Sequence, residues 1–133
     1  MNEGISLVVV PLLWVEDMAT SMEFYGRLGF ETVDVWKPND RPMWCSLKFG
    51  DAELMLQQSE GEIGLAEQES VTSEIELYFV CSDVELLYQS YVSNGLKVSK
   101  PRTAFYPMKQ IFLQDPDGRT LCFETPVPVQ NND

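Results

Sequence analysis

The side chains best suited to acid–base or nucleophilic chemistry are two glutamates and one cysteine, because the 133-residue chain contains no histidine. Glu76 and Glu124 lie in strand-like segments, and a carboxylate pair there could exchange protons with a bound molecule. Cys122 has no histidine to activate it and is expected to be a small buried filler. Glu124, near the end of its segment, is expected to be solvated. Glu76 is expected either to pair with Lys48 or Lys109 or to contact a ligand.

Aromatic side chains form a second group with binding chemistry, because indole and phenol rings stack on flat ligands and attract cations. The stacking candidates are Trp14, Trp36, Trp44, Tyr78, Tyr106 and Phe112. Negative charge for a cationic ligand is available from Glu74, Glu76 and Glu124, and hydrogen bonds from Gln57 and Gln110. Trp44 is the strongest single candidate for ligand contact, and its alternative role is burial at a dimer interface.

Periodicity and turn residues predict the elements that position these side chains. The first half is predicted as a buried strand at residues 5–15, a helix from Asp17 to Gly29, and strands at 30–36, 43–49 and 52–58. After an acidic linker at 59–73, the second half is predicted as a strand at 75–81, a helix from Asp83 to Gly95, and strands at 97–100, 108–114 and 119–125.

The second half copies the first at a nearly constant offset. Asp83 follows Asp17 by 66 residues, Gly95 follows Gly29 by 66, and Cys122 follows Met55 by 67. Each half is therefore predicted to be a βαβββ module, module one at 5–58 and module two at 74–126. Two equal units of this size must pack together to bury a core, which predicts one α+β domain over residues 1–133.

Alternation along the hairpin strands predicts which side chains share a face. The apolar face that should meet the helices carries Cys45, Leu47, Phe49, Leu54, Leu56, Ile111, Leu113, Leu121 and Phe123. The mixed aromatic and polar face carries Trp44, Ser46, Lys48, Glu53, Met55, Gln57, Gln110, Phe112, Gln114, Thr120, Cys122 and Glu124. A core does not require such a mixed face, so a curved sheet with a wet, ligand-holding concave side is predicted.

Composition limits the classes of partner. The 21 acidic residues outnumber 9 basic ones, and the net charge of −12 excludes a nucleic-acid surface while permitting a cationic ligand. No apolar run is long enough to span a membrane. The three cysteines lack metal or redox spacing, which indicates reduced thiols in a cytoplasmic protein.

Several segments together resemble the vicinal oxygen chelate superfamily of glyoxalases, bleomycin-resistance proteins and extradiol dioxygenases. They are Val15-Glu16-Asp17, Phe24-Tyr25, Leu28-Gly29-Phe30 and Asp115-Pro116-Asp117-Gly118, in that order, and the likeness extends from Leu7 to Thr125. The resemblance implies two βαβββ modules whose sheets form a cup around the ligand. It also implies a homodimer, with the cup completed within one chain or across two.

The metal-binding members of that superfamily place four ligands in the cup, at positions that match Val10, Met55, Glu76 and Cys122 here. Valine has no lone pair and methionine is a weak soft donor, so most of the ligand set is missing. The resemblance therefore implies no metal, no cofactor and no catalytic residues, as in the bleomycin-resistance branch.

The leading interpretation is non-catalytic binding of a small, partly aromatic and cationic molecule, with a role in antibiotic resistance. The predicted ligand-binding residues are Trp14, Trp36, Trp44, Met55, Gln57, Glu76, Tyr78, Tyr106, Gln110, Phe112, Cys122 and Glu124. One alternative is a metal-dependent lyase or isomerase of glyoxalase type that uses Glu76 and Cys122. Another is an interaction module that binds a peptide or protein partner.

Overall fold

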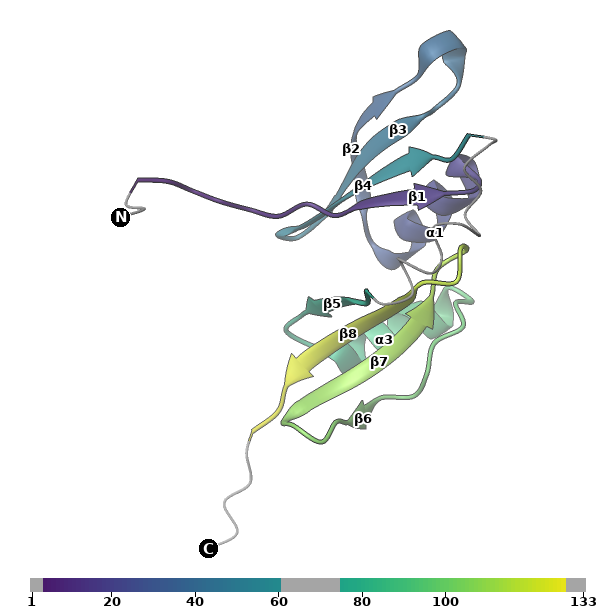
Figure 1. The fold of residues 1–133 in the computed structure, drawn as a ribbon. Helices are drawn as coiled ribbons and strands as arrows, with labels where there is room; N and C mark the ends of the chain where they lie inside the picture. The colour runs from purple at the N-terminus through teal and green to yellow at the C-terminus, as the bar shows by residue number, and fades with distance from the viewer. Residues whose placement is uncertain (1–3, 61–74, 129–133) are drawn as a thin grey trace, which may run out of the picture.

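The computed structural model describes residues 4–60 and 75–128 and contains two four-stranded sheets, each with one helix (Figure 1). The first sheet has the strand order β1-β4-β3-β2, in which β1 and β4 are parallel and the other pairs antiparallel. Its elements are β1 (Leu12–Val15), α1 (Met18–Leu28), β2 (Glu31–Trp36), the short helix η1 (Pro38–Asp40), β3 (Trp44–Phe49) and β4 (Ala52–Gln58).

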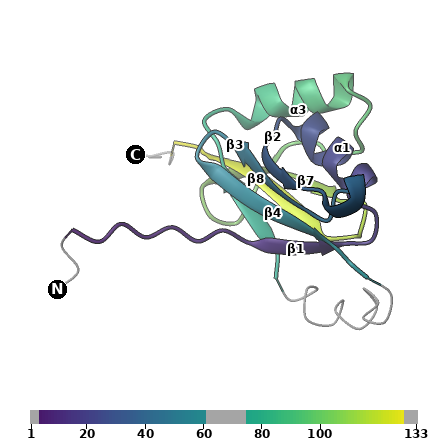
Figure 2. The same ribbon diagram turned by 90° about the horizontal axis from the view of Figure 1, so that it is seen from above.

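The second sheet repeats this arrangement with the order β5-β8-β7-β6, again with one parallel pair between its first two strands. Its elements are β5 (Leu77–Val80), α3 (Val84–Ser93), β6 (Arg102–Thr103), β7 (Met108–Gln114) and β8 (Thr120–Pro126). The predicted α+β fold of two βαβββ modules is therefore confirmed. Figure 2 shows α1 and α3 on the same side of the two sheets, so neither of these two helices covers the opposite faces.

Both helices begin at the predicted residues, α1 ends at the predicted Gly29, and α3 ends one residue before the predicted Gly95, with Asn94 as its C-cap. Asp83 accepts a hydrogen bond from the Leu86 backbone N–H at 3.1 Å, as an N-cap should. Asp17 occupies the equivalent position, but its carboxylate accepts from the Thr20 hydroxyl at 2.7 Å and bonds no backbone N–H. Gly29 ends α1 with a positive φ of 119°, a backbone conformation that favours glycine, and Phe49 lies against the space where a Cβ would sit.

The predicted apolar face forms the core. Leu47, Leu54, Ile111 and Leu121 are fully buried between their sheets and the helices. Phe79 joins the two modules, since its ring lies 5.8 Å from Phe30 of module one and 4.8 Å from Phe123 of module two. Each buried side chain of this size contributes about 1.5–3 kcal/mol, so the shared core stabilises the two modules as one unit.

The Asp-Pro-Asp-Gly turn between β7 and β8 attaches module two to module one. The Tyr25 hydroxyl of α1 donates to the buried Asp115 carboxylate at 2.8 Å, and Arg119 forms an ion pair with Asp115 at 3.1 Å. Arg119 also donates to the Trp14 carbonyl of β1, and the Glu16 N–H donates to Asp117 at 3.2 Å. These bonds fix the end of β1 that carries Trp14.

Three predicted strands differ from the observed ones. The predicted buried strand at 5–15 is wrong for its first part, because only Leu12–Val15 pairs with β4 and residues 4–9 are exposed. Pro11 has no N–H to continue the ladder, although its carbonyl accepts from Met55. The strand predicted at 75–81 is shorter, at Leu77–Val80. No strand forms at 97–100, and the two-residue β6 follows Pro101 instead.

The predicted linker at 59–73 lies outside the described residues apart from Ser59 and Glu60, and so does Glu74. The module bounds at 5–58 and 74–126 therefore stay a prediction. None of the helices in the described part of the chain is long and apolar enough to cross a membrane.

Candidate functional site

All three tryptophans of the chain lie in one cross-strand row on the first sheet, on the face away from α1. Trp14 on β1 is opposite Gln57 on β4, Gln57 is opposite Trp44 on β3, and Trp44 is opposite Trp36 on β2. Directly opposite residues place their Cβ atoms about 4.5–5.5 Å apart. We call these four residues the tryptophan row. It spans the full width of the sheet.

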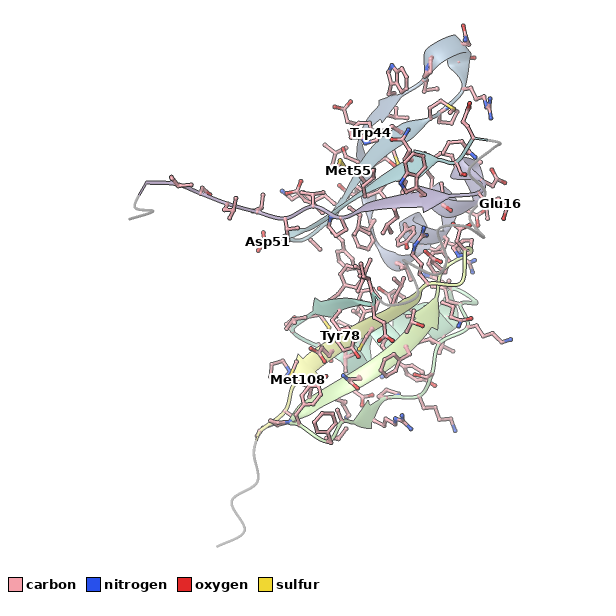
Figure 3. All side chains as sticks on the ribbon, viewed as in Figure 1. Glu16, Trp44, Asp51, Met55, Tyr78 and Met108 are labelled. Carbon is pink, nitrogen blue, oxygen red and sulfur yellow. The ribbon has the colours of Figure 1, made fainter. Side chains whose placement is uncertain are left out.

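The row is open to solvent. Trp36 is 58% exposed, and Trp14, Trp44 and Gln57 are half-buried. Met55 is half-buried in the next row on the same face, opposite Ser46 and Leu12 (Figure 3). An indole surface with an amide at its centre can stack on flat rings and hydrogen-bond their polar edges.

The second sheet carries a polar cluster on its corresponding face. Glu124 on β8 accepts hydrogen bonds from the Gln110 side-chain amide at 2.9 Å and from the Tyr106 hydroxyl at 3.3 Å. The Gln110 amide also donates to the Tyr106 oxygen at 2.8 Å. Burial, together with the neighbouring Glu124 carboxylate, raises the pKa of Tyr106, so this phenol stays a neutral donor.

Glu124 is only 8% exposed, so the prediction that it is solvated is wrong. Its cross-strand neighbour Gln110 and the loop residue Tyr106 cover it. Among the residues that the structure describes, no Lys or Arg forms an ion pair with it. A covered carboxylate of this kind favours a ligand that brings a positive charge.

Cys122, Tyr78 and Phe112 lie side by side on neighbouring strands of the same face. Burial, with Glu124 and Glu76 nearby, raises the pKa of the Cys122 thiol to about 12, so the thiol is neutral and acts as the predicted filler. Burial also raises the pKa of Tyr78, with contributions from Cys122 and from Glu76, to which the Tyr78 hydroxyl donates.

Of the two lysines predicted as partners of Glu76, Lys109 forms its ion pair with Glu85 of α3, at 2.5 Å. The predicted site residues thus form two groups. The tryptophan row with Met55 lies on the first sheet, and the group around Glu124 lies on the second; Figure 3 labels Trp44 and Tyr78 as one member of each.

The four positions at which metal-binding relatives would carry ligands do not form a metal site here. Val10 precedes β1, Met55 and Cys122 lie on β4 and β8, and Glu76 precedes β5. Valine offers no donor atom at its position, and methionine is only a weak soft donor. No three His, Cys, Asp or Glu side chains within residues 4–60 and 75–128 lie close enough to hold an ion. The donor set does not fit a catalytic metal.

The sequence did not predict a groove of about 540 Å³ between the β3–β4 turn and the segment that joins β5 to α3. Of the predicted site residues only Tyr78 lines it, together with Phe49, Asp51, Phe79 and Ser82. A comparison of the two repeats gives a signal for this groove, because the Gly50-Asp51 turn of module one is shorter than its counterpart Asp115-Pro116-Asp117-Gly118 in module two. The longer turn lies against the segment that joins β1 to α1, where the Glu16 N–H donates to Asp117.

Comparisons with known proteins agree with this architecture. The family model described as "Glyoxalase/Bleomycin resistance protein/Dioxygenase superfamily" matches residues 5–123. None of the curated proteins matches.

Three solved structures illustrate the shared fold. A bleomycin-binding protein complexed with bleomycin has a TM-score of 0.67 at 22% identity, covering 93% of this chain and all of that one. A bleomycin resistance determinant encoded on transposon Tn5 has a TM-score of 0.68 at 22% identity, covering 91% and 98% of the two chains. A putative glyoxalase family protein from Bacillus anthracis has a TM-score of 0.68 at 16% identity, covering 95% and 99%.

Proposed function

The chain belongs to the glyoxalase/bleomycin resistance protein/dioxygenase superfamily, and on that premise we propose that it binds a small, partly aromatic and cationic molecule without transforming it. The observation that carries this proposal is the tryptophan row, which places every indole of the chain on one open face. None of the three indoles belongs to the buried core, and together they supply a flat stacking surface.

Glu124 supports the cationic part of the proposal. It is a covered carboxylate that receives two neutral hydrogen bonds, and a ligand ammonium or guanidinium would complete its neutralisation. The phenol rings of Tyr78 on β5 and of Tyr106 in the β6–β7 loop add aromatic faces that attract a cation. The net charge of −12 draws such ligands toward the protein.

We further propose that the ligand is related to bleomycin and that binding protects a cell from it. A bleomycin-binding protein of similar fold is known in complex with bleomycin, which supports testing that compound first. We propose a cytoplasmic homodimer. The three free cysteines support the cytoplasmic location, and the exposed apolar side chains of Ile5, Leu7, Val8 and Val9 support the dimer.

Calorimetric titration of the protein with metal-free bleomycin tests the proposal. Stoichiometric binding to the wild-type chain, with loss of affinity in Trp44→Leu, is the expected result. Absence of binding heat at high micromolar ligand would remove bleomycin, and a screen of aromatic cations that also found no ligand would remove the proposed class. Bleomycin recovered chemically changed after incubation would contradict binding without turnover.

A further inference from the structure

The groove of about 540 Å³ beside the β3–β4 turn is a second candidate binding site, separate from the tryptophan row. Phe49, Phe79 and Leu87 line it with apolar side chains that also pack against the core. Among the described residues that line the groove, Asp51 is the one with a charged side chain. A volume of this size and an apolar lining are typical of small-molecule sites, and the single carboxylate favours a cation.

The other half of the repeat shows what occupies the equivalent junction there. The Arg119 guanidinium lies between β1 and the β7–β8 turn, where it pairs with Asp115 at 3.1 Å and with Asp117 at 3.6 Å. It also donates to the Trp14 carbonyl of β1. Only 8% of the Arg119 side chain is exposed, so this junction holds a guanidinium that is largely removed from water.

At the groove, the repeat has an alanine in place of this arginine. Residues of β8 follow their counterparts in β4 by 67 positions, so Arg119 corresponds to Ala52. Residues of β5 follow their counterparts in β1 by 66 positions, so Trp14 corresponds to Val80. Ala52 and Val80 both line the 540 Å³ groove. The groove is therefore the counterpart of the Arg119 junction, without an arginine of its own.

The groove offers two acceptors of the kinds that Arg119 uses. The Cys81 N–H donates to the Glu124 carbonyl of β8 at 2.8 Å, so the backbone carbonyl of the preceding Val80 points to the outer edge of β5. No strand within residues 4–60 and 75–128 pairs with that edge. The second acceptor is the exposed Asp51 carboxylate. A planar guanidinium can donate to a carbonyl and a carboxylate at once and stack on aromatic rings, whereas an ammonium is a compact point charge.

We propose that this groove binds a small guanidine with an apolar body. Its guanidinium lies between Asp51 and the Val80 carbonyl, as Arg119 lies in the other half of the repeat, and its apolar body lies on Phe49 and Phe79. The net charge of −12 favours such a cation over an anion. The groove shares no residue with the tryptophan row, so this site is independent of the function proposed above.

Nuclear magnetic resonance of the backbone amides during titration with butylguanidine tests the site. Saturable shifts at Phe49, Phe79 and Ser82 are the expected result. Butylamine, which has the same alkyl chain and an ammonium, should bind about tenfold more weakly. Absence of shifts at these amides would overturn the site, and equal affinity of the two compounds would overturn its selectivity for a guanidinium. The indole N–H signals report on the tryptophan row separately in the same spectra.

Two variants test the position of the guanidinium. Asp51→Asn should weaken the binding of butylguanidine about tenfold, because the amide has no charge. The matched control Asp34→Asn changes an exposed residue of β2, at the far edge of the first sheet, and should leave the affinity unchanged. Ala52→Arg supplies the missing guanidinium from within the chain and should abolish the saturable shifts. Unchanged affinity in Asp51→Asn, or in a folded Ala52→Arg, would contradict the proposed position.

Discussion

Glu124 lies on the open face of its sheet and is nevertheless 8% exposed, because Gln110 and Tyr106 cover it from two sides. The sequence correctly placed this glutamate on the sheet face away from the helices but predicted it to be solvated. The alternation of side chains along a strand predicts the face to which Glu124 points. It does not predict how buried Glu124 is, because that depends on the positions of Gln110 on the neighbouring strand and of Tyr106 in a loop.

Glu124→Gln should weaken binding of a cationic aromatic ligand about tenfold, equivalent to about 1.4 kcal/mol, because the amide oxygen still accepts hydrogen bonds but has no charge. Titration calorimetry measures the change. Glu23→Gln removes one charge from an exposed position on α1, on the other side of the sheets, and should leave the affinity unchanged. Equal affinity of all three proteins would show that Glu124 does not contact the ligand cation.

Trp44→Leu should reduce the affinity for an aromatic ligand about tenfold, since the indole at the middle of the tryptophan row is lost. The control Tyr88→Leu removes a half-buried aromatic ring from α3, on the other side of the sheets, and should bind normally. An unaffected Trp44 variant would argue against stacking on the row.

The buried Cys122 predicts a pH dependence of stability. Its pKa rises from 9.0 to about 12 on folding, so its contribution is fully present below pH 9 and is lost as the pH rises toward 12. Urea unfolding of wild type and Cys122→Ala between pH 8 and 11 compares the two slopes. The variant should lose less stability with rising pH, and parallel slopes would contradict the buried thiol.

At the scale of elements, the two hairpin turns differ in their roles. The β7–β8 turn binds module one through Asp115, Asp117 and Arg119, whereas the β3–β4 turn lies beside the 540 Å³ groove. The sequence predicts the strands on either side of both turns, and Asp115-Pro116-Asp117-Gly118 is one of the segments that resemble the superfamily. Its inter-module bonds depend on the approach of Tyr25 and Trp14, which no local pattern encodes.

Asp115→Ala should lower the free energy of unfolding by about 3–5 kcal/mol, because it removes the nearer carboxylate from the buried Arg119 and the acceptor from the buried Tyr25 hydroxyl. Asp51→Ala, in the exposed equivalent turn, should change it by less than about 0.5 kcal/mol. Chemical denaturation of both variants measures these differences. Equal effects would mean that the β7–β8 turn does not hold the modules together.

The segment before β1 shows a limit of predicting strands from apolar runs. The valine-rich run at 5–15 predicts one buried strand, but only Leu12–Val15 pairs with another strand among the described residues, and Ile5, Leu7, Val8 and Val9 are exposed. An apolar run indicates a tendency to form a strand and does not determine how much of the strand finds a neighbour.

At the scale of the whole molecule, the repeat was sufficient to predict the architecture. Three features of the sequence predict both modules and the faces of their sheets. They are the aspartates that begin the helices, the glycines that follow them, and the alternation along the four hairpin strands. They did not determine how site residues on different strands align. The tryptophan row depends on the registers of β1, β3 and β4, which follow from turn geometry and packing.

Nuclear magnetic resonance of the three indole N–H groups during titration with metal-free bleomycin tests the central claim most directly. Each tryptophan gives one side-chain signal, and all three lie in the row. Saturable shifts of these signals, with the α1 and α3 amides unchanged, are the predicted result. Unmoved indoles accompanied by shifts at Phe49, Phe79 and Ser82 would place the ligand in the 540 Å³ groove and contradict binding on the tryptophan row.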